Sequence, residues 1–108
     1  MDKNLKDYIL ELASECIIFS KEALSIVPSQ YTNGNFFMLQ AFYCAKKLEE
    51  IYYTEWQNIQ LLYFYREFHI FNKKYLANFL TRKDAKNEFP HLNSIYEQLK
   101  IELSINNS

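Results

Sequence analysis

Glycine is almost absent from this chain, which has one glycine and two prolines among its 108 residues. Tight β-hairpin turns depend on residues that tolerate positive φ, chiefly glycine, so this chain has little means of joining short antiparallel strands. It also lacks the glycine clusters that form phosphate-binding loops in dinucleotide-binding and P-loop proteins. The scarcity of glycine therefore favours helices and excludes two common kinds of nucleotide-binding site.

Cysteine and histidine are also scarce, with two of each: Cys16, Cys44, His69 and His91. A disulfide framework needs more cysteines than this, although one disulfide between the two stays open. Each cysteine lies on the apolar stripe of a different predicted helix, where it packs as a small hydrophobe. We recognise no CxxC, HxxxH or ExxH pattern in the sequence, and spacing gives neither histidine a catalytic partner. We therefore expect no metal, no cofactor and no enzymatic activity.

Neither sign of charge is in excess, because the formal net charge is −1. Residues 1–58 carry −3 and residues 59–108 carry +2, a mild asymmetry that argues against a general nucleic-acid binder. No apolar run approaches the roughly 18 residues of a membrane span. Asp7, Glu11 and Glu15 interrupt the region where a signal peptide needs an apolar run. We expect a cytoplasmic protein with no membrane partner.

Aromatic residues, in contrast, are abundant, at 18% of the sequence. The segment 36–79 has no glycine or proline and holds 14 of the 19 aromatic residues. In its second half, large apolar side chains recur every three or four residues, which places them on one face of a helix. We call this set the aromatic spine and expect it at the centre of the core: Leu61, Phe64, Phe68, Phe71, Tyr75 and Phe79.

The hydrophobic pattern predicts an all-α fold, a compact bundle of about four helices forming a single domain over residues 1–108. The helices are expected at about 4–27, 36–54, 58–80 and 90–104. Residues 28–35 should form a loop with a turn at Asn33-Gly34, and Pro90 should open the last helix. Glu55 would fall within the apolar stripe of a continuous helix. We therefore expect a break near it, with one kinked helix over 36–80 as the alternative.

An acidic ridge lies opposite the apolar arc of the first predicted helix. It consists of Asp7, Glu11, Glu15 and Glu22. Neighbouring carboxylates four residues apart repel one another, so the ridge is either a solvated face or a surface for a basic partner.

The third predicted helix should expose apolar side chains as well as bury them. Tyr63 and Ile70 point away from the aromatic spine, together with Arg66, Glu67 and Lys74. Outward-facing Phe42 and Tyr53 on the second helix, and Ile17 and Leu24 on the first, would add to them. Several exposed apolar residues on a small protein can merge into an interaction surface, which tyrosine and arginine often anchor.

Two nucleic-acid hypotheses have weaker support. Basic residues cluster late in the chain, at Lys73, Lys74, Arg82, Lys83 and Lys86, but Asp84 and Glu88 dilute them, which favours a solvated connector. Residues 36–50, FFMLQAFYCAKKLEE, resemble the second helix of helical RNases of the HEPN type. The resemblance implies a catalytic arginine followed by four to six residues and a histidine. Two residues separate Arg66 from His69 and eight separate Arg82 from His91, so neither pair fits.

The sequence thus favours a binding protein over an enzyme. We expect a non-catalytic intracellular module that binds another, possibly basic, protein, in the manner of an immunity protein that neutralises a toxin by covering its surface. The residues expected to bind it are Asp7, Glu11, Glu15, Glu22, Tyr63, Arg66 and Ile70. The alternatives are a helical homodimer with a structural or regulatory role, a small nucleic-acid-binding protein, and an HEPN-like nuclease.

Overall fold

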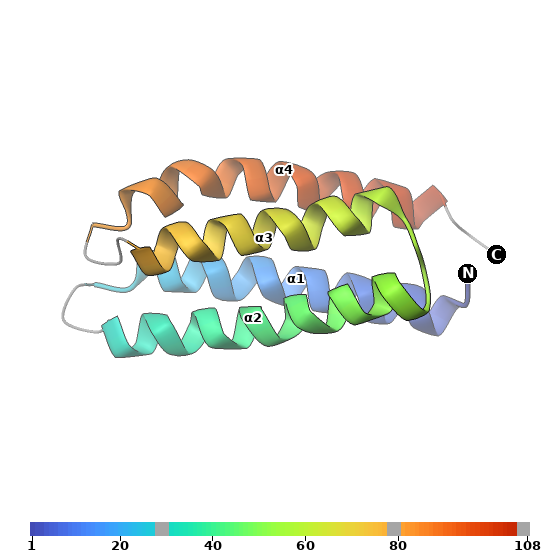
Figure 1. Ribbon diagram of the computed structural model, residues 1–108, viewed down its shortest axis with the longest axis horizontal. Helices are drawn as coiled ribbons and strands as arrows, with labels where there is room; N and C mark the ends of the chain where they lie inside the picture. The colour runs from blue at the N-terminus through green and yellow to red at the C-terminus, as the bar shows by residue number, and fades with distance from the viewer. Residues whose placement is uncertain (28–30, 78–80, 106–108) are drawn as a thin grey trace.

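Four α-helices make up the computed structural model, which describes residues 1–27, 31–77 and 81–105. They are α1 (Lys3–Ser25), α2 (Tyr31–Thr54), α3 (Ile59–Ala77) and α4 (Lys83–Ile105). The helices run lengthwise in a bundle measuring 47 × 21 × 19 Å (Figure 1). The predicted all-α bundle is confirmed.

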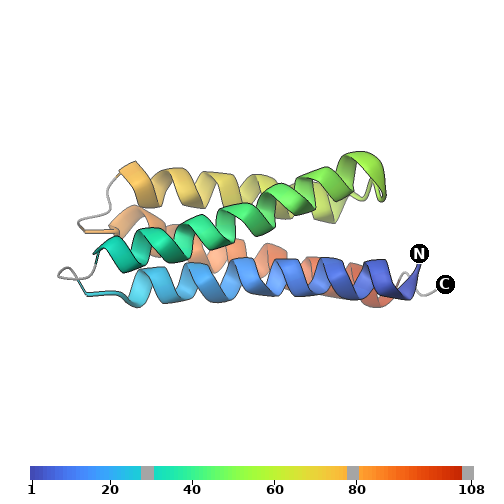
Figure 2. The same cartoon turned by 90° about the horizontal axis from the view of Figure 1, so that it is seen from below.

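The helices follow one another up and down the bundle, so that the start of α1 and the end of α4 lie at the same end (Figures 1 and 2). The most extensive packing joins α1 to α2 and α3 to α4, and the α2–α3 and α1–α4 contacts close the ring. Consequently α1 and α3 lie diagonally across the bundle from each other. Within the described ranges, no helix is both long and apolar enough to cross a membrane.

The aromatic spine occupies the centre of the core, as its spacing predicts. Leu61, Phe64, Phe68, Phe71 and Tyr75 are at most 1% exposed, while Phe79 lies outside the described residues. Buried aliphatic side chains from the other three helices surround the spine, including Ile9, Leu12, Met38, Leu48, Leu92, Leu99 and Leu103.

Helix α1 begins after Asp2, whose Oδ1 accepts a hydrogen bond from the Asn4 amide at 3.1 Å. It ends at Ser25, two residues before the predicted end. Two sequence-based assignments on this helix are wrong: Ile17 and Leu24, both expected to face outward, are buried and packed against the core, respectively. The buried arc is therefore wider than its spacing predicts.

Helix α2 begins at Tyr31 and contains Asn33 and Gly34, so the predicted turn at this pair is wrong. Gly34 is buried against Ala23 and Ile26 of the α1 end and the Tyr75 hydroxyl of α3. A β-carbon at this position would collide with that hydroxyl. Glycine is therefore explained here by close helix packing rather than by a turn. Residues 28–30 of the predicted loop lie outside the described part of the chain.

The chain does break between α2 and α3, which confirms two helices over the kinked alternative. Glu55 forms a turn, and Asn58 caps α3 by accepting a hydrogen bond from the Gln60 amide at 2.8 Å. The Asn58 side chain also donates to Glu102 Oε1 at 2.9 Å, which ties this connection to α4.

Helix α4 begins at Lys83, well before the predicted start, and Pro90 lies inside it. Because Pro90 is exposed and has no N–H, it removes one intrahelical hydrogen bond on the solvent side. Arg82 precedes the helix with a φ of 55°, in the left-handed region. The early start extends α4 along α3, and the candidate functional site depends on this extension.

Candidate functional site

The residues predicted to bind a partner fall on two separate surfaces. Asp7, Glu11 and Glu22 are exposed on α1, and Tyr63, Arg66 and Ile70 are exposed on α3. Because α1 and α3 lie diagonally across the bundle, the two sets do not form one continuous patch. Helix α2 lies between them on one side.

Glu15 differs from the rest of the acidic ridge because it is half-buried and turned toward α2. The Cys44 thiol donates a hydrogen bond to Glu15 Oε2 at 3.2 Å, and the Cys16 thiol donates to the Ala41 carbonyl at 3.4 Å. Both cysteines are free thiols. Burial raises the pKa of Cys16, whereas the interaction with Cys16 lowers the pKa of Cys44.

A groove of about 790 Å³ runs along the α1–α2 side of the molecule. Glu15 lines it from α1, and Tyr43, Lys46, Glu49 and Tyr53 line it from α2. A second groove, of about 430 Å³, follows the α2–α3 side and contains the predicted residues Arg66 and Ile70. Glu49 and Tyr53 line both grooves. The outer surface of α2 is thus a ridge between them, which we call the α2 face.

His69 lies in the wall of the second groove. Its Nε2 is 3.9 Å from Glu49 Oε1, and its ring packs edge-on against Phe42 and Phe68. Burial lowers the pKa of His69, although the Glu49 carboxylate opposes this effect. His69 therefore packs between aromatic rings beside one carboxylate.

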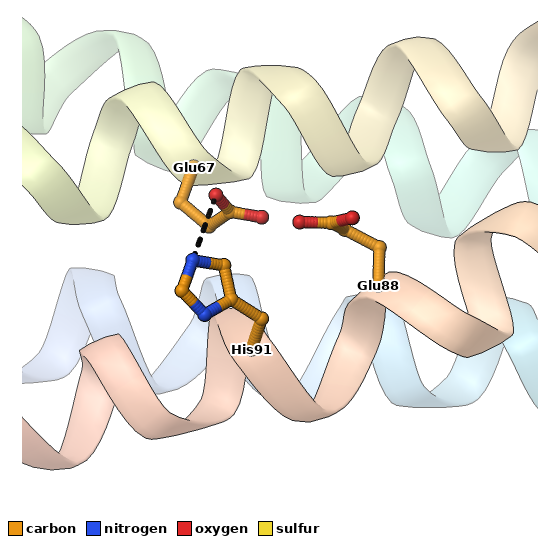
Figure 3. A group of neighbouring side chains, drawn as sticks. All are labelled: Glu67, Glu88 and His91. Atoms are coloured by element: carbon orange, nitrogen blue, oxygen red, sulfur yellow. Dashed lines mark ion pairs between the residues drawn. The ribbon is translucent and has the colours of Figure 1, made fainter.

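A different cluster of polar side chains lies between α3 and α4. It consists of Glu67 from α3 and Glu88 and His91 from α4, which we call the junction triad (Figure 3). His91 Nε2 lies 3.5 Å from Glu67 Oε1. The Glu67 and Glu88 carboxylates point toward each other, with the imidazole beside them (Figure 3).

Glu67 is the unusual member of the triad because it is only 6% exposed. Among the described residues its Oε2 has no N–H or hydroxyl donor beside it. Burial and the adjacent Glu88 carboxylate raise the pKa of Glu67 to about 8. Interaction with Glu67, together with the Lys74 ammonium 2.6 Å from its Oε1, lowers the pKa of Glu88. The two carboxylates are therefore held in different protonation states near neutral pH.

The prediction that Glu67 faces solvent is wrong, and the early start of α4 explains why. The first two turns of α4 cover the side of α3 on which Glu67 lies, and they bring Glu88 and His91 to it. The sequence-based statement that the chain has no ExxH pair is also wrong, because Glu88-Phe89-Pro90-His91 has this spacing. Glu-x-x-His places two ligands on one helical face in the carboxylate-bridged metal sites of four-helix bundles.

The basic cluster was expected to be a solvated connector, and this expectation is wrong for Arg82. The side chain is buried, at 4% exposure, and its Nη1 donates a 2.8 Å hydrogen bond to the Ala23 carbonyl of α1. Lys74 is engaged with Glu88. Two of the five basic residues therefore stabilise helix contacts, which reduces the positive surface available to a nucleic acid.

Comparison of the chain with family models, curated proteins and solved structures gives no match.

Proposed function

We propose that this protein binds another protein, without catalysing a reaction, through the α2 face and the grooves on either side of it. It would act in the cytoplasm by covering a surface of its partner, as an immunity or inhibitor protein does. The proposal rests on one observation above all. Tyr43 and Tyr53 are 56% and 64% exposed on the ridge that separates the two grooves.

Tyrosine is well suited to anchor such an interface because it buries a large ring while retaining a polar hydroxyl. The grooves beside the ridge can accept side chains from the partner on both sides. Further exposed apolar residues continue the surface along α2, at Phe36 and Leu39. By contrast, α4 exposes only Ile101 and Ile105 among its large described apolar side chains. The apolar surface is therefore concentrated away from α4.

The charge on the α1 side of the α2 face favours a partner with basic side chains. Glu15, Glu49 and Glu50 line the α1–α2 groove, and the exposed residues Asp7 and Glu11 extend the acidic surface along α1. Lys46, which lies 3.0 Å from Glu49, and Lys47 offset part of this charge, and the α2–α3 groove is lined by Arg66 and Lys73 as well as Glu49. Complementary charge mainly speeds encounter and excludes wrong partners, whereas desolvated aromatic anchors prolong the complex.

The test compares two sets of variants against a partner recovered by cross-linking in the native host. Tyr43→Ala with Tyr53→Ala should raise the dissociation rate at least about tenfold, because anchor residues contribute roughly 2 kcal/mol or more. Ile101→Ala on α4 is the matched control and should leave binding unchanged. Asp7→Lys with Glu11→Lys should slow association, and this effect should shrink as salt screens the charges. Unchanged kinetics in both sets would contradict the proposal.

A homodimer is the second candidate, because Phe36, Leu39 and Tyr43 follow helical spacing along α2 and can pair with a second copy. Light scattering after size-exclusion chromatography measures the molar mass in solution and so distinguishes a homodimer from a monomer that binds another protein. A dimer that Tyr43→Ala converts to a monomer would assign the α2 face to self-association.

A further inference from the structure

We infer that the junction triad, Glu67, Glu88 and His91, binds a divalent first-row transition-metal ion, for which zinc fits the ligand set best. The site lies between α3 and α4, apart from the α2 face, so it is independent of the proposed partner surface. The ion would link the two helices through one imidazole and two carboxylates.

The geometry of the triad suits a metal ion. Each residue offers one ligand atom, and the three atoms lie within 4.8 Å of one another. Ligands at 2.0–2.2 Å from a tetrahedral zinc ion are about 3.4 Å apart, so the side chains must close by roughly 1 Å. His91 can make this adjustment because its side chain is 62% exposed. Glu67, held between the helices, provides the fixed ligand.

The buried Glu67 carboxylate points to a missing cation. An isolated buried carboxylate is costly, and such groups are normally paired, hydrogen-bonded or bound to a metal. Glu67 Oε1 lies 3.5 Å from His91 Nε2, and Oε2 has no N–H or hydroxyl donor beside it in the described part of the chain. The Glu67 carboxyl group faces the Glu88 carboxylate, to which it hydrogen-bonds when protonated (Figure 3). A metal ion held by the triad would take the place of that proton and supply the positive charge between the two carboxylates.

Lys74 is the competing cation. Its ammonium lies 2.6 Å from Glu88 Oε1, but the side chain is 44% exposed and leads to solvent. The ammonium can therefore move away when a metal ion takes the carboxylate. Removing it should strengthen metal binding, which is a result that a structural role for the triad does not predict.

The ligand types select among metals. Imidazole with two carboxylates suits zinc and its transition-metal neighbours better than magnesium or calcium, which prefer oxygen ligands throughout. Three protein ligands are fewer than the four of a closed structural zinc site. One coordination position would therefore remain for water or for another ligand.

The test is calorimetric titration of Zn²⁺ into the untagged, metal-free chain at neutral pH. We expect one ion per chain with micromolar affinity. Glu67→Gln and His91→Ala should each weaken binding at least about tenfold, and Lys74→Met should strengthen it. Co²⁺ should give visible absorption bands with the parent chain that are lost with His91→Ala.

His69→Ala is the matched control, because His69 is the other histidine and also lies beside a glutamate, Glu49. It should leave the affinity unchanged. Circular dichroism establishes that each variant is folded, and His91→Ala alters only an exposed side chain. The inference is overturned if zinc fails to bind below about 1 mM, or if His91→Ala binds as tightly as the parent.

Discussion

Among the described residues, two charged side chains, Arg82 and Glu67, are buried, and they differ in the partner that faces them. At the end of the bundle where α1 gives way to α2, the Arg82 guanidinium donates a 2.8 Å hydrogen bond to the Ala23 carbonyl, beside the Tyr75 hydroxyl and Gly34. We call this the Arg82 junction. In the junction triad, the buried Glu67 carboxyl group faces the Glu88 carboxylate (Figure 3).

We interpret the difference as a structural role for Arg82 and, for Glu67, as the place of the inferred metal ion. A charged donor that faces a carbonyl acceptor stabilises the fold, whereas two carboxyl groups that face each other cost free energy unless a proton or a cation lies between them. We therefore expect removal of the Arg82 guanidinium to destabilise the protein. Neutralising Glu67 should instead stabilise it when no metal is bound.

A truncation in the aromatic spine, which lies between the two junctions, should have the largest effect on stability. Phe68 is fully buried at the middle of α3. Phe68→Ala should lower the free energy of unfolding by about 3–5 kcal/mol, because it removes buried apolar surface and leaves a cavity. Urea denaturation measures this change. A loss below about 1 kcal/mol would contradict the central position of Phe68.

Arg82→Met should cost about 2–3 kcal/mol at neutral pH, since it retains a long side chain but removes the charged hydrogen bond to Ala23. The neighbouring Lys83 is exposed, so Lys83→Met is the control and should change stability little. Thermal and urea denaturation of both variants make the comparison. Equal stability of the two would mean that the buried guanidinium contributes nothing to the fold.

Glu67→Gln should have the opposite sign and depend on pH. The folded-state pKa of Glu67 is raised to about 8 from its ordinary 4.5. Between these values the folded protein holds a proton that the unfolded chain releases, so the parent loses stability as pH rises through this window. Glutamine does not titrate, so the variant does not lose stability as pH rises through this window. We expect the variant to gain about 1–2 kcal/mol relative to the parent between pH 6 and pH 8.

Urea denaturation in buffers that contain a chelator measures the Glu67→Gln effect. Titration of Glu88 does not contribute to the difference between pH 6 and pH 8. Its pKa is lowered in the folded protein, so it affects stability only below about pH 4.5, where the carboxylate becomes protonated. A difference between variant and parent that stays constant across pH 6–8 would show that Glu67 is not protonated in the folded chain at neutral pH.

The sequence predicts the apolar core far better than either junction. Periodic side chains such as Phe64 and Phe68 reveal their buried face through spacing alone, because that face is a property of one helix. Arg82 lies in a polar run, TRKDAKNE, and only the left-handed backbone and the position of α1 direct it inward.

The junction triad depends on where α4 begins, and local signals give the wrong answer there. Pro90 is typical of a first helical turn, yet it lies within α4. Asn33-Gly34 is likewise typical of a turn, yet it lies within α2. At Gly34 the packing against α1 and α3 overrode the local preference, and before Pro90 the buried Ala85 and the contact of Phe89 with Phe71 hold the preceding turns in the helix. The Glu88-x-x-His91 spacing was visible in the sequence, but its partner Glu67 was identified only from the packing of α3 on α4.

The smallest expected effect tests the packing at the Arg82 junction. Alanine usually stabilises a helix by about 1 kcal/mol relative to glycine. At Gly34 the added methyl group would collide with the buried Tyr75 hydroxyl. Overpacking of this kind costs about 1–3 kcal/mol, so Gly34→Ala should lower stability by about 1 kcal/mol overall.

Tyr75→Phe removes the atom responsible and provides the matched background. The next neighbours of the new methyl group, the Ala23 carbonyl oxygen and Ile26 Cβ, would lie at 3.7 and 3.8 Å, ordinary van der Waals distances. In that background Gly34→Ala should therefore raise stability by about 1 kcal/mol, the helix-propensity gain alone. A double-mutant cycle from urea denaturation should give a coupling of about 2 kcal/mol. If Gly34→Ala changes stability equally in both backgrounds, the Tyr75 hydroxyl does not explain why glycine occupies this helical position.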